Sequence, residues 1–436
     1  MASTAGGMAR MQLKQFVPKA GMTAAASCSY STVSRVAHVT RSNNAELRLN
    51  PATNLETRHF SCSTAIRSSW PAGSHDEPPC NLNLTSTSKA KGKATITCIP
   101  SPPRSKTIAD IQSLKASNIP IVCITAHDYP SALSIRSAPV DLCLIGDSLA
   151  NVALGHTSTQ PLSLDAMIHH SQAVKRGLDA PLFLAAHLLD GIDLPQSPLV
   201  IADMPFGSTF GSIDSAVASV VKLIQQTGVD GVKIEGSYEI IPLIQRLTHH
   251  GIPVMGHLGL QPQRVGSTSG YRVQAKTASS AKDILDASHA LEKAGCFSIV
   301  LECIPTRIGE YISTHLEIPT IGIGAGSKTD GQILVMNDML GDLTGAGHVL
   351  AALSQTTTEA KAEAKLPKSS QLTPAPPKFV RNFCPEGTSI GALRIQAVQA
   401  YTNAVRERNF PQDNAEGYKM KSDEWRAFLQ LVGEQS

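Results

Sequence analysis

Ionisable side chains close seven of the eight short apolar runs in the middle of this chain. They are Asp128, Asp147, Asp203, Glu235, His257, Glu302 and Asp338. Taken singly, each acid could simply cap a helix that follows a strand. Brought together, so many carboxylates would repel one another unless a cation neutralised them. Because the candidates include one histidine, no thiolate cluster and no His-Glu-x-x-His motif, the donor set favours Mg²⁺, with Asp147 and Asp203 as its best ligands.

The apolar runs themselves predict the elements that would gather these side chains. Most are four to six β-prone residues long and bounded by Gly or Pro, as buried parallel strands are; they span 121–128, 142–148, 199–207, 231–236, 253–260, 298–305, 319–326 and 333–338. Amphipathic stretches of helical length lie between most of them. Ser163 is a candidate N-cap for one such helix, and Gly228 is a candidate stop for another. The linker after the seventh run is too short for a full helix.

Eight such units predict a (β/α)8 TIM barrel. A doubly wound open sheet is the competing architecture, but no Gly-x-Gly-x-x-Gly motif opens a helix after the first strand. In a barrel the carboxyl ends of all strands converge on one mouth, where the chemistry of such folds takes place. The fold therefore supplies a reason for the seven ionisable residues to meet.

Lys233 and Glu235 alternate with apolar residues inside one predicted strand, so they share a face of it. A buried lysine needs a negative partner, because an unpaired buried charge is expensive. One interpretation is a structural Lys233–Glu235 ion pair that lines the barrel. The other, which we favour at a barrel mouth, is that Lys233 binds an anion.

Charge is distributed unevenly along the 436 residues. The net charge of +3 divides into +8 for residues 1–104 and −5 for 105–436. A mildly acidic body argues against nucleic acid as a partner. The sequence contains no apolar run long enough to span a bilayer, so we expect no membrane partner. Its cysteines form no Cys-x-x-Cys pair, which indicates free thiols, buried at Cys123, Cys143, Cys296 and Cys303.

Residues 1–104 are rich in Ser, Thr, Ala and Arg and poor in acids, which is typical of a mitochondrial transit peptide. Arg58, Phe60 and Ser63 resemble the pattern near matrix-processing sites. We therefore expect a disordered leader and a mitochondrial matrix protein. If the leader is only a tail without targeting function, the protein is cytoplasmic.

Composition and patterning divide the chain into four segments. Residues 1–104 form the leader, 105–353 the barrel, 354–377 a low-complexity insertion, and 378–436 a C-terminal helical segment that completes or flanks the barrel. The stretch 178–198 contains an additional apolar run that we do not assign.

Several motifs in the same order resemble ketopantoate hydroxymethyltransferases. They are IGDS (145–148), ADMPFG (202–207), VKIEG (232–236), PVMGHLGLQPQ (253–263), VLECIP (300–305) and IPTIGIGAG with TDGQILV (318–335). The resemblance covers about residues 104–346 and resumes weakly at 378–383 and 401–411. It implies a Mg²⁺-dependent (β/α)8 barrel that forms homo-oligomers, decamers in bacteria. The implied reaction transfers a hydroxymethyl group from 5,10-methylenetetrahydrofolate to 3-methyl-2-oxobutanoate through a Mg²⁺-stabilised enolate, and it yields 2-dehydropantoate for pantothenate synthesis.

The resemblance also implies roles for single residues. Asp147 and Asp203 would hold the metal, with Glu235 supporting it. Asp147, Ser148, Asp203 and Lys233 would contact the 2-oxo acid, with His257 as a further substrate-binding candidate. Glu302 would accept the proton that leaves the substrate carbon C3.

Three positions depart from the family pattern: His127 replaces Tyr, and Ala150 and Ala275 each replace Gly. Two rival interpretations remain. One is a Mg²⁺-dependent 2-oxo acid lyase or mutase of the isocitrate-lyase barrel type, although no Lys-Lys-Cys-Gly-His segment is present. The other is an inactive barrel that binds a metabolite. An intact set of acids and Lys233 favours the enzyme.

Overall fold

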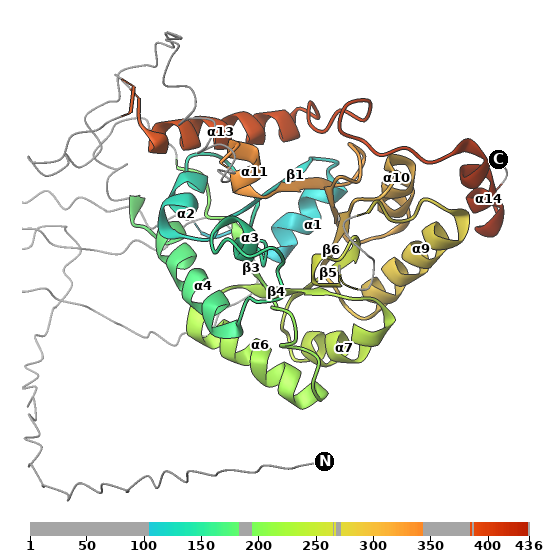
Figure 1. Ribbon diagram of the computed structural model, residues 1–436, viewed down its shortest axis with the longest axis horizontal. Coiled ribbons are helices and arrows are strands. Elements are labelled where there is room, and N and C mark those ends of the chain that lie inside the picture. The colour runs from blue at the N-terminus through green and yellow to red at the C-terminus, as the bar shows by residue number, and fades with distance from the viewer. Residues whose placement is uncertain are drawn as a thin grey trace, which may run out of the picture. The chain divides into compact units, whose positions relative to one another are not determined.

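The computed structural model describes residues 104–182, 194–264, 266, 272–342, 384–385 and 388–434. Eight parallel strands form a closed barrel in chain order, and the last strand pairs with the first (Figure 1). The strands are β1 Ile121–Thr125, β2 Leu142–Ile145, β3 Leu199–Asp203, β4 Gly231–Glu235, β5 Val254–Gly259, β6 Ser298–Glu302, β7 Thr320–Ile323 and β8 Gly331–Leu334. The predicted TIM barrel is confirmed.

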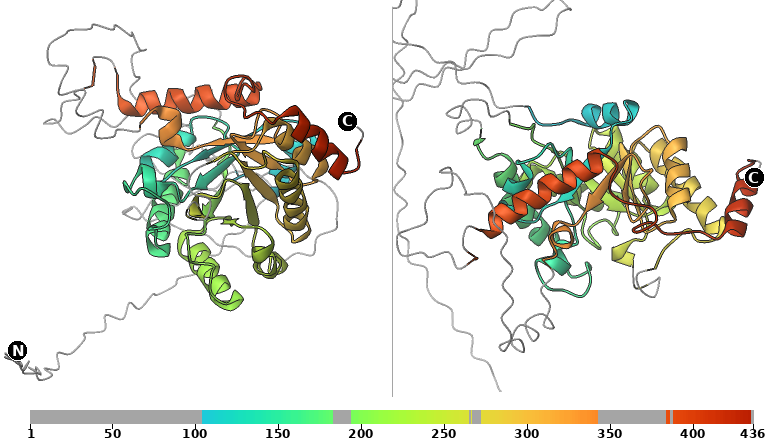
Figure 2. Two further views of the ribbon diagram at one scale, coloured as in Figure 1. Left: turned by 45° about the vertical axis from the view of Figure 1, so that its right-hand side comes forward. Right: turned by 90° about the horizontal axis from the view of Figure 1, so that it is seen from above.

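Helices connect most of the strands and surround the barrel (Figure 2). They are α1 Ile108–Ala116, α2 Tyr129–Ile135, α3 Leu149–Val152, α4 Leu164–Leu178, α6 Ile213–Thr227, α7 Ile241–His249, α9 Ala278–Lys293, α10 Thr306–His315, α11 Met336–Leu340, α13 Ile390–Arg406 and α14 Ser422–Leu431. Two short 3₁₀ turns, η1 Tyr238–Ile240 and η2 Pro262–Arg264, follow β4 and β5. Ser163 caps α4 by accepting a hydrogen bond from the backbone of Ala166, and Gly228 ends α6 with φ of 69°. Both predicted helix ends are confirmed, and β7 passes to β8 without a helix.

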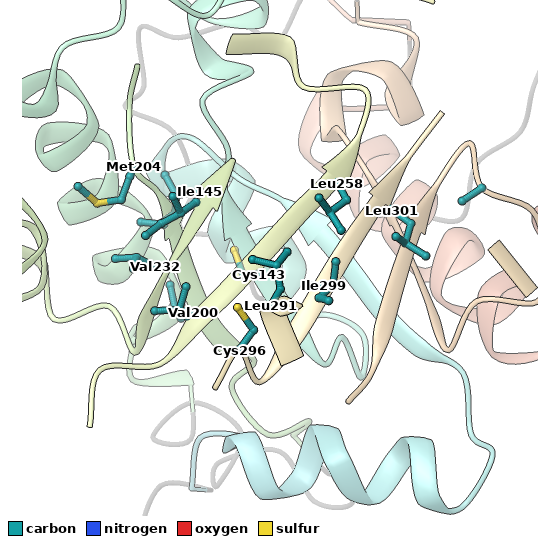
Figure 3. Close-up of a cluster of buried hydrophobic side chains, with 14 of the residues drawn as sticks. Cys143, Ile145, Val200, Met204, Val232, Leu258, Leu291, Cys296, Ile299 and Leu301 are labelled. Atoms are coloured by element: carbon teal, nitrogen blue, oxygen red, sulfur yellow. The ribbon is translucent and has the colours of Figure 1, made fainter. Parts of the chain in front are cut away.

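Alternation along the strands sorts apolar side chains into two layers. One layer fills the barrel interior and includes Ile121, Cys123, Leu142, Leu144, Leu199, Ile201, Met255 and Val300. The other lies between the barrel wall and the helices and includes Cys143, Ile145, Val200, Val232, Ile299 and Leu301 (Figure 3). Ile111 of α1 belongs to the interior layer, so α1 closes the amino-terminal end of the barrel. On a strand such as β3, residues 199 and 201 point inward, and so must residue 203.

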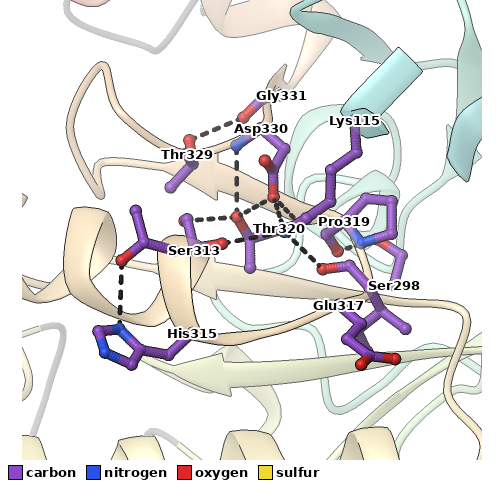
Figure 4. Close-up of polar contacts among 12 residues, drawn as sticks. Lys115, Ser298, Ser313, His315, Glu317, Pro319, Thr320, Thr329, Asp330 and Gly331 are labelled. Atoms are coloured by element: carbon purple, nitrogen blue, oxygen red, sulfur yellow. Dashed lines mark hydrogen bonds and ion pairs between the residues drawn. The ribbon is translucent and has the colours of Figure 1, made fainter. Parts of the chain in front are cut away.

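Polar networks hold the strands together at that amino-terminal end. Asp330 accepts hydrogen bonds through Oδ2 from the backbone and hydroxyl of Thr320 and from Lys115 Nζ, at 2.8, 2.9 and 2.9 Å (Figure 4). Asp141 is fully buried, contacts Lys106 and Arg406, and accepts from the backbone of Val122. These contacts stabilise the fold at one end of the barrel, while the opposite end remains available for chemistry.

The C-terminal helices pack on the outside of the barrel. The hydroxyl of Tyr401 on α13 lies 3.0 Å from the carbonyl oxygens of Cys123 and Gln332, so α13 covers the seam between β1 and β8. On α14, the ring of Phe428 packs against that of Tyr311 on α10.

Within the described ranges, no helix is both long and apolar enough to cross a membrane.

Several sequence predictions fall outside the described residues or need correction. Residues 1–103 of the leader, the 354–377 insertion and residues 183–193 of the 178–198 stretch lie outside, and the segment boundaries stay predictions. Cys123, Cys143 and Cys296 are buried free thiols as predicted, but Cys303 is only half-buried. Strand β8 begins two residues before the predicted run, because Gly331 and Gln332 pair with β1.

Candidate active site

Inward-pointing polar residues replace the apolar interior at the carboxyl ends of β3 to β6. Strand register sets them side by side: Asp203 on β3 pairs with Lys233 on β4, and Glu235 on β4 pairs with His257 on β5. Glu302 ends β6 opposite Gly259. These residues and Asp147, which follows β2, form what we call the mouth cluster: Asp147, Asp203, Lys233, Glu235, His257 and Glu302. All but Glu302 are buried, with 2 to 7% of their surface exposed.

Lys233 is the centre of charge in the mouth cluster. Its Nζ lies 2.7 Å from Oδ1 of Asp203 and 3.2 Å from Nδ1 of His257. The sequence interpretation that pairs Lys233 with Glu235 is therefore wrong: the closest carboxylate comes from the neighbouring strand. Lys233 remains a cation that faces the interior of the mouth.

His257 connects Lys233 with Glu302. The ammonium of Lys233 can only donate, so Nδ1 of His257 accepts and the ring proton is assigned to Nε2. That Nε2 lies 3.2 Å from Oε2 of Glu302. Burial lowers the pKa of His257 and the charge of Lys233 adds to that effect, while Glu302 acts in the opposite direction.

Close packing of β5 against β6 fixes the backbone of Glu302. Gly259 has φ of 90°, and a Cβ there would lie 2.1 Å from the carbonyl oxygen of Glu302. The same oxygen accepts a hydrogen bond from the backbone of Leu260 at 2.8 Å. The Glu302 side chain is 17% exposed, so it is the member of the cluster that an incoming molecule reaches most easily.

Asp147 enters the cluster from the loop after β2. Its backbone N–H donates to Oδ2 of Asp203 at 2.9 Å. Its own Oδ2 accepts from the side-chain amide of Gln263 at 2.8 Å. Ser148 is the N-cap residue of α3, where its hydroxyl makes no capping bond. Ala150 follows inside α3 and is fully buried.

Burial controls the protonation of the cluster. It raises the pKa of Asp203 and that of Glu235, while Lys233 acts in the opposite direction on both. Burial acts to lower the pKa of Lys233, but the surrounding carboxylates outweigh it and hold the pKa above its ordinary value. A second cation at the carboxylates would relieve their mutual repulsion.

Two of the seven predicted mouth residues take no part in the cluster. Asp128 caps α2, accepting from the backbone of Ser131 at 2.8 Å, which is the alternative that the sequence left open. Asp338 does not close a strand, because β8 ends at Leu334; it lies in the first turn of the short helix α11. The other five converge.

Gln263 is a site residue that the sequence did not predict. It is 6% exposed, and besides its bond to Asp147 it donates from its side chain to the carbonyl of Met204 at 3.0 Å. Its backbone N–H donates to Oε2 of Glu235 at 3.1 Å. An uncharged amide on a turn has no periodicity to reveal it; the available signal was its place at the end of the motif 253–263.

The oxygen donors fit Mg²⁺ as a two-carboxylate site. Across the described ranges, no group of three or more His, Cys, Asp or Glu side chains could hold a metal ion. Mg²⁺ commonly takes one or two protein carboxylates together with water and substrate, which Asp147 and Asp203 can provide. Oε1 of Glu235 is buried without a hydrogen-bond donor, which suits an outer ligand that accepts from a metal-bound water.

Comparison with known proteins decides the family. The sequence model of the ketopantoate hydroxymethyltransferase family matches residues 105–362, more than half of the chain. This chain belongs to that family. A 3-methyl-2-oxobutanoate hydroxymethyltransferase of Lysinibacillus sphaericus (strain C3-41) is 38% identical over 328 residues, which cover 75% of this chain and 98% of the relative. Another, from Anaeromyxobacter sp. (strain Fw109-5), is 41% identical over 312 residues, or 72% and 87% of the two chains.

The mouth cluster therefore belongs to a member of the ketopantoate hydroxymethyltransferase family. The resemblance inferred from the six motifs is confirmed. Among solved structures, oxaloacetate acetylhydrolase in complex with oxalate is 15% identical with a TM-score of 0.42, over 60% of this chain and 91% of that one.

Proposed function

We propose that this chain transfers a hydroxymethyl group from 5,10-methylenetetrahydrofolate to 3-methyl-2-oxobutanoate and so forms 2-dehydropantoate, a step of pantothenate biosynthesis. The observation that carries the proposal is the convergence of Asp147, Asp203, Lys233 and Glu302 in one mouth of a family barrel. The relatives at 38 and 41% identity bear the name of this activity.

The 2-oxo acid would bind through its negative charge. Lys233 supplies a buried cation for the carboxylate or the keto oxygen, and Asp203 holds that cation by an ion pair. The hydroxyl of Ser148, free of any capping bond, is available to donate to the same substrate. His257, whose Nδ1 lies 3.2 Å from Nζ of Lys233, would contact the same substrate.

Asp147 and Asp203 would hold Mg²⁺, with Glu235 accepting from one of its waters. Bound there, the ion supplies Lewis-acid polarisation of the keto oxygen. That donor set consists of oxygens only, which is the preference of this metal.

Glu302 would remove the proton from C3 of the substrate. A general base needs reach to the proton, and Glu302 is the partly exposed carboxylate of the mouth cluster. His257 directs its Nε2 toward this carboxylate and so orients it. As the proton leaves, negative charge grows on the keto oxygen, where Lys233 can stabilise it. The resulting nucleophilic C3 then bonds to the methylene carbon of the folate, whose two bonds to the folate nitrogens are broken. One water supplies the hydroxyl oxygen, and the C3 proton and one proton of that water pass to the two nitrogens as tetrahydrofolate leaves.

Product analysis tests the proposal. Purified protein, Mg²⁺, 3-methyl-2-oxobutanoate and 5,10-methylenetetrahydrofolate should yield 2-dehydropantoate, and omission of the folate should abolish it. Cleavage or rearrangement of a 2-oxo acid without folate would support the lyase or mutase alternative. Binding without any turnover would support the inactive barrel.

We also propose that residues 1–104 direct the protein to the mitochondrial matrix and that the enzyme is a homo-oligomer. The +8 charge and the low content of acids support the first proposal. A fluorescent protein fused behind residues 1–104 should enter mitochondria; cytosolic fluorescence would contradict it. Sedimentation of the purified chain tests the second, and a monomer would reject it.

A further inference from the structure

Gln263 makes more contacts with the mouth cluster than its place on a loop would suggest. It lies in η2, beyond the end of β5, yet its partners belong to the ends of three other strands. They are Asp147 after β2, Met204 after β3 and Glu235 at the end of β4. Since β3 and β4 separate β2 from β5, Gln263 spans the mouth above them.

The side-chain amide is fixed in one orientation. Its nitrogen donates to Oδ2 of Asp147 at 2.8 Å and to the carbonyl of Met204 at 3.0 Å, so both amide protons are used. The backbone on which this side chain stands is tied down as well. Its N–H bonds to Glu235, and its carbonyl accepts from Gln160 at 3.0 Å. Because its own amide is fixed, Gln263 can in turn fix the carboxylate of Asp147.

We infer that Gln263 is a positioning residue for Asp147: it fixes one carboxylate oxygen so that the other faces the metal and the substrate. With Oδ2 bound to the amide, Oδ1 is the oxygen assigned to the ion. The inference rests on the metal role proposed above for Asp147. It adds a residue that never touches the reacting atoms and acts through a ligand.

The chemistry of the amide explains why glutamine suits this position. A lysine or arginine would also donate to Asp147, but its positive charge would oppose a cation at the same carboxylate. A glutamate would place another negative charge in the cluster. A neutral donor orients Asp147 without changing the charge that the ion meets, and loss of such outer partners commonly lowers metal affinity about 10–100-fold.

Gln263→Met tests the inference, because methionine keeps the length and volume but has no donor. Mn²⁺ serves as the probe, and its binding to the full-length protein is followed by electron paramagnetic resonance without substrate. We expect the affinity for Mn²⁺ to fall about 10–100-fold. The apparent KM for Mg²⁺ should rise similarly, while kcat at saturating Mg²⁺ recovers most of its value. If Gln263 only stabilised the fold, the apparent KM for Mg²⁺ would not rise while kcat recovered.

Gln261→Met is the matched control. Gln261 belongs to the same motif, and its amide donates to a backbone carbonyl, that of His257, at 3.1 Å. It should bind Mn²⁺ as the wild type does. Wild-type affinity in a folded Gln263→Met protein would overturn the inference.

The remaining outcomes are also decisive. If Gln263→Met does not fold, Gln263→Asn, one methylene shorter but still an amide, is measured in the same way. A reduced Mn²⁺ affinity of Gln263→Asn supports the inference, and an unchanged affinity overturns it. Failure of Gln263→Asn to fold also overturns it, because Gln263 would then be needed for the stability of the fold. A wild-type protein that binds no Mn²⁺ would reject the metal site and Gln263 together, whereas an unaffected variant rejects Gln263 alone.

Discussion

Asp203 and Lys233 are register partners on β3 and β4, and their side chains meet inside the barrel with Oδ1 2.7 Å from Nζ. Both are nearly fully buried. Burial raises the pKa of Asp203 and of Glu235, and the charge of Lys233 acts against that rise. The ammonium thereby favours the ionised form of the carboxyl groups around it.

Lys233→Met should destabilise the protein and abolish turnover. The substitution leaves buried carboxylates without their cation, which we expect to cost about 3–5 kcal/mol in the free energy of unfolding. Urea denaturation measures it. Lys222→Met is the control, because Lys222 pairs with Asp165 on the surface and its loss should cost no more than about 1 kcal/mol. Equal losses in the two variants would contradict the central place of Lys233.

Mg²⁺ should stabilise the folded protein through Asp203. A ligand that binds only the folded state at 100 times its Kd adds about 2.7 kcal/mol, so the unfolding temperature should rise with Mg²⁺. Asp203→Ala should remove this rise. Asp338→Ala, which changes an acid of α11 outside the mouth cluster, should retain it. Asp203→Ala with a wild-type response to Mg²⁺ would exclude Asp203 as a ligand.

Cys303, next to Glu302, should react slowly with alkylating reagents. Burial raises its pKa to about 11, and the negative charge of Glu302 contributes. Because the thiolate is the reactive form, its alkylation by iodoacetamide should rise about tenfold per pH unit between about pH 7.5 and 9.5. The alkylation rate of a peptide thiol with a pKa near 8.5 levels off in that range. Glu302→Gln should lower the pKa of Cys303 and speed its alkylation. An alkylation rate of the wild type that levels off below pH 9.5 would contradict the raised pKa.

Ala275→Gly should leave stability unchanged or increase it by about 1 kcal/mol. Ala275 has φ of 51°, a left-handed conformation that costs an L-residue about 1–2 kcal/mol and glycine little. Glycine loses part of that gain through its greater freedom in the unfolded chain. Ala287→Gly, inside α9, should instead destabilise by about 1 kcal/mol or more. Thermal unfolding compares them, and equal destabilisation would show that Ala275 is not strained.

The fold was largely predictable because residues that are buried in strands and helices form recognisable apolar patterns in the sequence. Short apolar runs predicted β1 to β7 and their order, and Ser163 and Gly228 marked helix ends. The start of β8 was missed because Gly331 and Gln332 have little strand propensity of their own. They become a strand through pairing with β1, where a Cβ on Gly331 would lie 2.6 Å from the carbonyl of Ile121.

The site was predictable to the extent that it consists of charged strand ends. Position alone indicated Asp203, Lys233 and Glu302, but it could not distinguish them from Asp128, which caps a helix. The partner of Lys233 depends on the register between strands, which no single segment contains. Gln263 depends on a turn that crosses the mouth, and that path is set by tertiary packing.

Exchange of the C3 proton of 3-methyl-2-oxobutanoate for deuterium tests most directly whether Glu302 removes this proton in a mouth organised by Lys233 and a metal ion. Nuclear magnetic resonance should show exchange with wild-type protein and Mg²⁺ in the absence of folate. Glu302→Gln should bind the 2-oxo acid with similar affinity yet lose exchange by about 10²–10⁴-fold. Exchange at the wild-type rate in Glu302→Gln would contradict the role of Glu302 as the base.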